Sequence, residues 1–115
     1  MHELGIANSI LETVRAEAAQ HMGSRVCKVG LRIGELSGVN PEALQFCFGA
    51  LVKDSRLDPL PLEIEFCPRR QRCGVCGCAF VVADYDTGCP FCGSEQTECV
   101  GGTELEFSYI ELEET

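Results

Sequence analysis

The stretch Cys73-Gly74-Val75-Cys76-Gly77 is echoed, after a gap of twelve residues between the two cysteine pairs, by Cys89-Pro90-Phe91-Cys92-Gly93. Each Cys-x-x-Cys pair can close a tight turn that points two thiolates at one ion. The glycine that follows relieves the left-handed backbone that such a turn tends to need. Four thiolates fill a tetrahedron around Zn²⁺ and leave no open position for water, which is typical of a structural site. The spacing therefore predicts structural zinc at Cys73, Cys76, Cys89 and Cys92.

Other uses of these thiols are an iron site, as in a rubredoxin-type electron carrier, and a redox-active disulfide. Two pairs at this spacing favour a metal over a disulfide. Cys78, two residues after Cys76, could replace a ligand. We interpret it as a spare thiol, with the two cysteines that flank the four, because none completes another Cys-x-x-Cys pair: Cys67 and Cys99. The two remaining cysteines, Cys27 and Cys47, lie on apolar faces and are predicted to be core thiols.

The cysteines gather in a stretch whose composition differs from the rest of the chain. Residues 67 to 102 hold seven of the nine cysteines, several glycines and few large aliphatic residues. A stretch of this kind cannot bury a stable core alone, so it needs a metal ion to fold. We predict a zinc-binding module at residues 68–102, inserted into a host domain that is made of residues 1–67 and 103–115.

The host sequence predicts two helices. Apolar residues three and four apart indicate a first helix that ends near Gly23, with an inward stripe of Leu4, Ala7, Ile10, Leu11, Val14 and Ala18. Asn40 can cap a second helix, Pro41 fits its first position, and Glu42 suits the positive end of its dipole. This helix should end between residues 53 and 56, and its inward residues are Ala43, Leu44, Cys47, Phe48, Leu51 and Val52.

Three runs of alternating apolar and polar residues predict strands. They cover residues 27–33, 62–66 and 105–109. In the first run Cys27, Val29, Leu31 and Ile33 form the apolar face. The apolar face of the last run is Leu105, Phe107 and Tyr109.

Composition excludes several classes of protein. The 115 residues are 45% apolar and 23% charged, which is typical of a globular domain. Eighteen acidic against nine basic residues give a net charge of −9, which disfavours nucleic acid and anionic lipid as partners. The longest apolar run, residues 78 to 83, is too short to cross a membrane. Without a secretory pattern at the start, we expect a reducing, cytoplasmic location for so many cysteines.

Three arginines come just before the first cysteine pair: Arg69, Arg70 and Arg72. They can offset the formal charge of −2 on zinc held by four thiolates. The alternative is a zinc ribbon that binds RNA or DNA. Four acidic residues of the same module argue against it: Asp84, Asp86, Glu95 and Glu98.

The first three residues, Met1-His2-Glu3, form a second candidate metal site. An α-amine, the next amide nitrogens and an imidazole at position 2 can bind a tetragonal cation, and Ni(II) and Cu(II) favour that geometry. Glu3 could add an oxygen. On chemistry alone His2 can equally be an ordinary surface histidine. His21, near the end of the first helix, has no partner at ligand spacing.

Taken together, these motifs resemble the HypA/HybF family of nickel metallochaperones, which act in nickel-iron hydrogenase maturation. The resemblance rests on the Met-His-Glu-Leu start, Gly34-Glu35-Leu36-Ser37, Pro41-Glu42-Ala43-Leu44 and the two Cys-x-x-Cys pairs. It extends from residue 1 to about residue 112, which is nearly the whole chain.

The resemblance implies an α+β fold, with two helices on a small three-stranded sheet and the four-cysteine zinc-ribbon module inserted before the last strand. It implies that His2 binds nickel with Met1 and Glu3, and that the four cysteines hold zinc. The implied role is a carrier and not an enzyme. The implied partners are a nickel-handling GTPase (HypB-like) and the hydrogenase large-subunit precursor, with urease accessory proteins as a second client.

Overall fold

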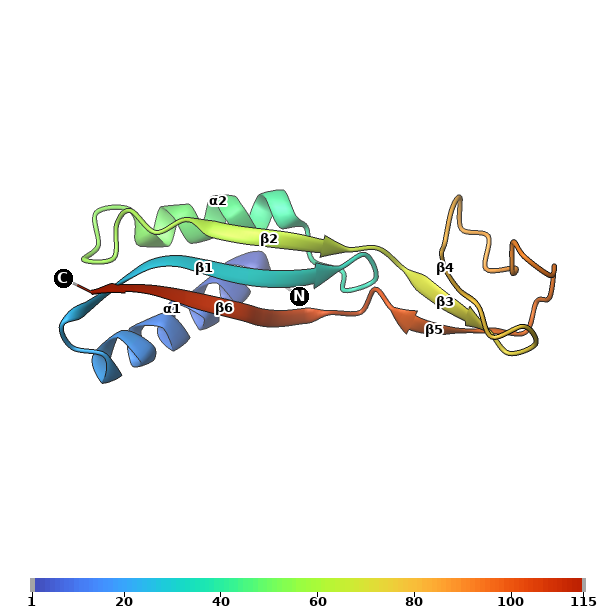
Figure 1. Cartoon of the computed structure of the whole chain (residues 1–115). Helices are drawn as coiled ribbons and strands as arrows, with labels where there is room; N and C mark the ends of the chain where they lie inside the picture. The colour runs from blue at the N-terminus through green and yellow to red at the C-terminus, as the bar shows by residue number, and fades with distance from the viewer. Residues whose placement is uncertain (1, 115) are drawn as a thin grey trace.

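The computed structural model describes residues 2–114 and contains two helices and six strands. They follow one another as α1 (Glu3–Gln20), β1 (Ser24–Gly34), α2 (Pro41–Val52), β2 (Leu62–Cys67), β3 (Arg70–Cys73), β4 (Ala79–Val81), β5 (Thr97–Gly101) and β6 (Leu105–Glu114). The strands form two three-stranded sheets, ordered β2-β1-β6 and β4-β3-β5. The molecule is elongated, 55 × 26 × 16 Å, with the smaller sheet at one end (Figure 1). Neither helix is long and apolar enough to span a membrane.

The larger sheet and the two helices form the predicted α+β host. β1 lies in the middle, parallel to β2 and antiparallel to β6. Parallel neighbours need a long crossover connection, and α2 supplies it between β1 and β2. Both helices lie on the same side of the sheet and contact each other (Figure 1). The expected fold class is therefore confirmed.

The core fills the space between these helices and the sheet. Its most deeply buried side chains come from α1, α2 and β1: Leu11, Val14, Leu44, Phe48, Val29 and Ile33. The predicted stripe of α1 is wrong at Leu4, whose residue is 56% exposed. Leu4 lies one turn before Ala7, in the first turn of α1, where it lines a shallow surface hollow with Leu51 of α2.

Both ends of α2 follow the local sequence. The Asn40 Oδ1 accepts a hydrogen bond from the Ala43 N–H at 3.1 Å, and Pro41 occupies the first turn. The helix ends at Val52, one residue before the predicted range, and the Lys53 N–H still donates to the Gly49 carbonyl. The cap prediction is thus confirmed, because it depends on residues that are neighbours in sequence.

Two β-bulges change the predicted faces of β1 and β6. Pairing shifts by one residue at Cys27, so Val26 enters the core at 3% exposure, and Cys27 is only partly buried. A second shift lies between the pairs Gly30–Tyr109 and Leu31–Phe107. The predictions of a core thiol at Cys27 and of one shared face for Phe107 and Tyr109 are therefore wrong. An inserted residue reverses the alternation beyond it.

Tyr109 instead covers Gly30 on the sheet face opposite the helices, where any β-carbon at Gly30 would overlap its ring. Charged side chains occupy the rest of that face. Arg32 contacts Glu65 at 3.1 Å and Glu106 at 2.7 Å, and it lies 3.9 Å from Glu104.

Glu104 provides a test of this charged face. Its own backbone N–H, the Gly102 N–H at 2.8 Å and the Arg32 charge lower the pKa of the Glu104 carboxyl below its ordinary value of 4.5. A lowered pKa stabilises the fold above the unfolded-state pKa, and this contribution is lost as pH falls through the folded-state pKa. We expect Glu104→Gln to lower the free energy of unfolding at neutral pH, and the difference from wild type to vanish in acid. Urea denaturation across pH checks this, and a pH-independent difference would contradict it.

The two sheets meet at a close backbone crossing. The Gly34 N–H donates to the Glu104 carbonyl at 2.7 Å, and the Leu36 N–H donates to the Gly102 carbonyl at 2.6 Å. A β-carbon at Gly34 would overlap the backbone of Gly102. The two sheets can therefore approach this closely only because residue 34 is a glycine, which has no side chain.

We expect Gly34→Ala to lower the free energy of unfolding by about 1–3 kcal/mol, since the overlap is with backbone that cannot move aside locally. Gly49→Ala on α2 is the control, because no atom lies within 4 Å of its β-carbon position. There alanine should stabilise the helix by about 0.5–1 kcal/mol. Urea denaturation measures the free energy of unfolding of both variants. An equal increase in both would show that residue 34 has room for a β-carbon and would contradict the prediction.

Candidate metal centres

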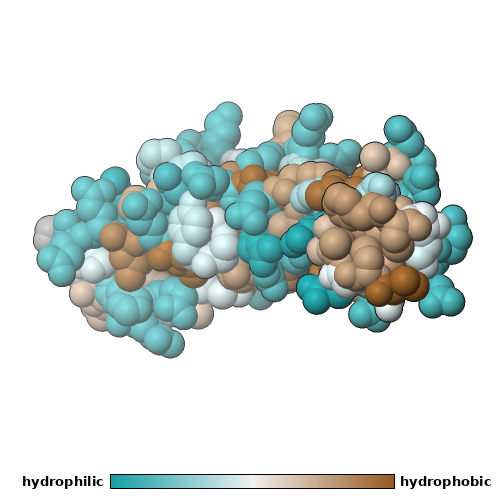
Figure 2. Space-filling view, turned by 45° about the vertical axis from the view of Figure 1, so that its right-hand side comes forward, coloured by the Kyte–Doolittle hydropathy of each residue, from teal (hydrophilic) through white to brown (hydrophobic). Residues whose placement is uncertain are grey.

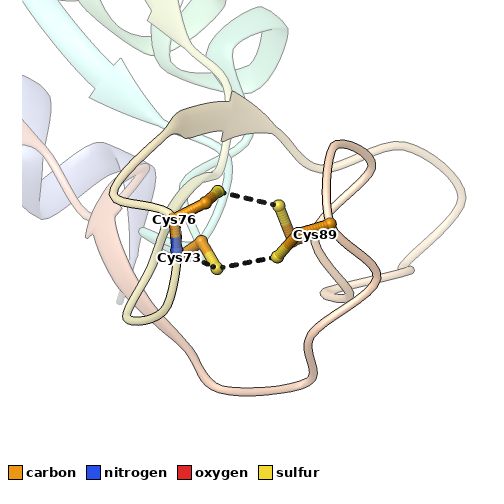
Figure 3. Close-up of side chains that lie close together, drawn as sticks. Cys73, Cys76 and Cys89 are labelled. Carbon is orange, nitrogen blue, oxygen red and sulfur yellow. Dashed lines mark hydrogen bonds between the residues drawn. The ribbon is translucent and has the colours of Figure 1, made fainter.

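Four cysteine sulfurs meet at the end of the smaller sheet. Cys73 closes β3, Cys76 lies in the turn that follows, and Cys89 and Cys92 come from the loop between β4 and β5. The Cys73 and Cys92 sulfurs are 3.5 Å apart, and those of Cys76 and Cys89 are 3.6 Å apart. All four sulfurs lie within 4.8 Å of one another. Figure 3 shows the side chains of Cys73, Cys76 and Cys89 pointing toward one another from the two segments.

These distances fit a tetrahedral metal. With Zn–S bonds of about 2.3 Å, the sulfurs of a zinc tetrahedron lie about 3.8 Å apart. The observed contacts of 3.5 and 3.6 Å need only a small expansion. Soft thiolates in this number and geometry suit zinc, or iron in a rubredoxin-type site. The residues that spacing alone had selected are therefore the ones that the fold brings together.

The two turns around the cysteines are built alike. Gly77 donates to the Cys73 carbonyl at 3.0 Å, and Gly93 donates to the Cys89 carbonyl at 2.9 Å. Gly77 has φ +80° and Gly93 has φ +79°, the left-handed conformation expected from the sequence. In each turn the backbone N–H two residues after the first cysteine donates to that cysteine's sulfur. The Val75 N–H does so to Cys73, and the Phe91 N–H does so to Cys89. The repeated pentapeptide thus encodes a repeated ligand-holding turn.

Hydrogen bonds to sulfur give two of the thiols thiolate character. The N–H groups of Cys76 and Val75, with the Cys92 thiol, lower the pKa of Cys73 to about 6, although burial acts in the opposite direction. Burial also acts to raise the pKa of Cys89, but N–H donors outweigh it and the pKa falls below the ordinary value of 9.0. Thiolate is the metal-binding form of cysteine. The turns therefore prepare the Cys73 and Cys89 sulfurs for a cation, whereas burial and hydrogen bonds to the neighbouring cysteine sulfurs raise the pKa of Cys76 and Cys92.

Gln71 supports this site and was not singled out in the sequence. It is the one polar side chain among the buried residues of the described chain, at 4% exposure. Its Nε2 donates to the Thr97 Oγ1 at 3.1 Å, and that hydroxyl donates to the Thr87 carbonyl at 2.6 Å. This chain of bonds ties β3 to β5 and to the loop that carries Cys89. In the sequence, the role of Gln71 is indicated only by its position two residues before Cys73.

The other thiols of the module lie outside the four-sulfur group. Cys78 and Cys99 are exposed, and the Cys99 sulfur contacts the Gly101 carbonyl at 3.3 Å. Cys67 is buried at the end of β2, where burial raises its pKa. Cys47 packs at the edge of the host core.

Two of the arginines that precede the first cysteine pair, Arg70 and Arg72, are exposed on β3 on either side of the buried Gln71. Arg72 lies opposite Glu98 in the β3–β5 ladder, and Arg69 donates to the Gln71 Oε1 at 3.4 Å. Apolar side chains instead gather at this end of the molecule, as Figure 2 shows. Exposed members include Val75, Val81 and Phe91.

α1, whose start carries His2 and Glu3, lies beside the larger sheet and away from the smaller sheet that carries the cysteines (Figure 1). His2 is exposed and precedes the first turn of α1. The Glu3 Oε2 accepts a hydrogen bond from the Asn40 N–H at 3.4 Å, which holds the start of α1 against the start of α2. Met1 lies outside the described residues. His21 pairs with Glu17, at 3.6 Å on the helix surface.

Comparison with known proteins decides what this combination of sites belongs to. The family model described as hydrogenase/urease nickel incorporation, metallochaperone, hypA matches residues 1–112. The chain belongs to the HypA family. A hydrogenase maturation factor HypA of Geobacter metallireducens is 42% identical over 113 residues, which are 98% of this chain and all of that protein. The corresponding protein of Prosthecochloris aestuarii is 38% identical over the same lengths.

Solved HypA structures share the fold. A solution structure of a HypA protein has a TM-score of 0.68 at 22% identity, covering 97% of this chain and 96% of its own. The solution structure of the nickel metallochaperone HypA from Helicobacter pylori has a TM-score of 0.63 at 21% identity, covering 97% of both chains. This HypA chain is thus a member of a metallochaperone family for hydrogenase maturation, with a four-cysteine metal site.

Proposed function

We propose that this HypA chain is a non-enzymatic carrier that binds Ni(II) at its N-terminus and delivers it to the hydrogenase large-subunit precursor. The observation that carries the proposal is the exposed His2 just before α1, in a chain that matches a nickel-incorporation family over residues 1–112. Nickel would be the cargo of this site. The Met1 amine, the His2 imidazole and Glu3 would provide its ligands.

The surroundings of His2 favour loading and release. An exposed site on the first residues of a helix leaves coordination positions that a receiving protein can fill. The Asn40 N–H restrains the Glu3 carboxylate, whereas the His2 side chain is exposed to solvent. A carrier needs this combination, because a closed cage would hold its cargo too tightly to transfer it.

A second part of the proposal gives the four cysteines a structural role. Cys73, Cys76, Cys89 and Cys92 would hold Zn(II), which has no open position for chemistry in a four-thiolate site. Residues 68–102 would form the zinc-binding module, and residues 1–67 with 103–115 the nickel-binding domain. None of the nine cysteines forms a disulfide, which favours the reducing cytoplasm as the location.

The proposed partners follow from the family. A nickel-handling GTPase of the HypB kind would exchange nickel with this chain, and the hydrogenase precursor would receive it. Urease accessory proteins are a second proposed client, because the description of the matching family names urease beside hydrogenase.

Calorimetric titration of Ni(II) into two zinc-loaded forms tests the carrier proposal. One form carries two extra residues before Met1, and the control carries the same two residues after Thr115. The first extension moves the amine away from His2, so we expect it to abolish nickel binding while the control binds as wild type. Equal binding by both forms would place nickel elsewhere, for example at the spare thiols.

A further inference from the structure

An open groove runs between α1 and the last strand of the host sheet. It has a volume of about 440 Å³ and is mostly apolar. Its floor and strand side are formed by Leu31, Leu105 and Phe107, and its helix side by Ile6 and Ile10. Phe107 remains 38% exposed there. The groove therefore offers apolar surface that the fold itself leaves uncovered.

Small residues widen the groove on the helix side. Gly5, Ser9 and Thr13 lie four residues apart, on the same face of α1, and all three line it. No atom lies within 4 Å of the β-carbon position of Gly5. Open space at this glycine indicates room for another chain.

β6 forms the other wall and is an edge strand. In the sheet of the described residues it pairs with β1 on one side, and no strand pairs with its other side. Unpaired N–H and C=O groups along an edge can pair with an extended segment of another protein. Leu105 and Phe107 share one face, because they lie opposite Ile33 and Leu31. An added strand would thus place alternate side chains over the groove.

Charge distinguishes between the segments that could occupy this place. β6 contains Glu106, Glu111, Glu113 and Glu114 and no basic residue, and in the described residues arginines of β1 pair with Glu106 and Glu113 only. Pairing two copies of β6 would bring these like charges together, which destabilises cross-strand pairs. A segment with basic residues would instead complement the strand. The charge pattern therefore argues against a second copy of this chain and for a basic partner.

We propose that the α1–β6 groove binds an extended segment of a partner protein, in which apolar residues alternate with lysine or arginine and the backbone pairs with β6. His2 lines one end of the groove, so such a segment would lie next to the proposed nickel site. The proposal extends the carrier function to a partner surface. Its test contains no nickel, so the two proposals can fail independently.

The test uses an acetylated, fluorescein-labelled peptide of alternating lysine and valine, without histidine or cysteine, and zinc-loaded full-length protein. Fluorescence anisotropy should show saturable binding. Gly5→Leu fills the groove at a position with free space, and we expect it to weaken binding at least tenfold. Gly49→Leu is the matched control, since Gly49 is a helical glycine with equally open space on α2. It should bind as wild type.

Further arms identify the occupant. A peptide with glutamate in place of lysine should bind at least tenfold more weakly. Ser9→Leu, one helical turn along the groove, repeats the test if circular dichroism shows that Gly5→Leu is not folded. Absence of saturable binding, or equal binding by the groove variants and wild type, would overturn the proposal. So would a wild-type dimer in analytical ultracentrifugation that Gly5→Leu converts to monomer, because the groove would then hold a second copy.

Discussion

Replacing Cys73 with alanine is expected to remove zinc from the protein and to unfold the β3–β4–β5 sheet. Cys73 is 1% exposed, and its sulfur accepts hydrogen bonds from the N–H groups of Val75 and Cys76. Structural zinc contributes about 10–16 kcal/mol of binding free energy in small zinc domains, and that free energy is folding free energy. The few apolar side chains of this sheet cannot replace it, since in the described residues the buried cluster around Cys73 and Cys89 adds Phe80, with a partly buried valine against it.

The host domain should survive this change. Its core lies between α1, α2 and the larger sheet, and none of the buried residues of that core comes from the module. We therefore expect zinc content by mass spectrometry to fall to near zero, and helical circular dichroism to change little. Cys78→Ala is the control and should keep its zinc. Unaltered zinc in Cys73→Ala would remove this residue from the ligand set, and loss in both variants would add Cys78 to it.

Replacing His2 with alanine is expected to abolish nickel binding while zinc content and folding stay as in wild type. His2 is exposed and packs in no core, so the change removes one imidazole and little else. Loss of residues that merely support metal ligands costs about 10–100-fold in affinity, and loss of a ligand should cost more. His21→Ala is the matched control, because the chain has two histidines and the His21 side chain pairs with Glu17 on the helix surface.

Calorimetric titration of Ni(II) measures both histidine variants. Nickel binding that survives in His2→Ala, or that is lost in His21→Ala, would contradict the N-terminal site. Glu3→Gln is informative beside them, since it retains an oxygen that can accept from the Asn40 N–H and removes only the charge. A smaller loss of affinity is expected there than in His2→Ala.

The amino-acid sequence determined the features that depend on neighbours along the chain. The cap of α2 by Asn40 and the two glycine-relieved cysteine turns are confirmed because each is closed by hydrogen bonds across only a few residues. The grouping of Cys73 with Cys89 was also predictable, since the spacing of the two pairs matches the needs of one tetrahedral ion. The family resemblance, which runs over the whole chain, added the order of the elements.

Tertiary structure decided where strands meet. The bulges that send Val26 and not Cys27 into the core, and Tyr109 onto Gly30, arise from pairing between β1 and a strand about eighty residues away. The three short strands of the module and the role of Gln71 likewise depend on non-local partners. So does the α1–β6 groove, whose walls come from opposite ends of the chain. Local patterns encode local geometry, whereas register and open surfaces emerge only when distant segments compete for the same core.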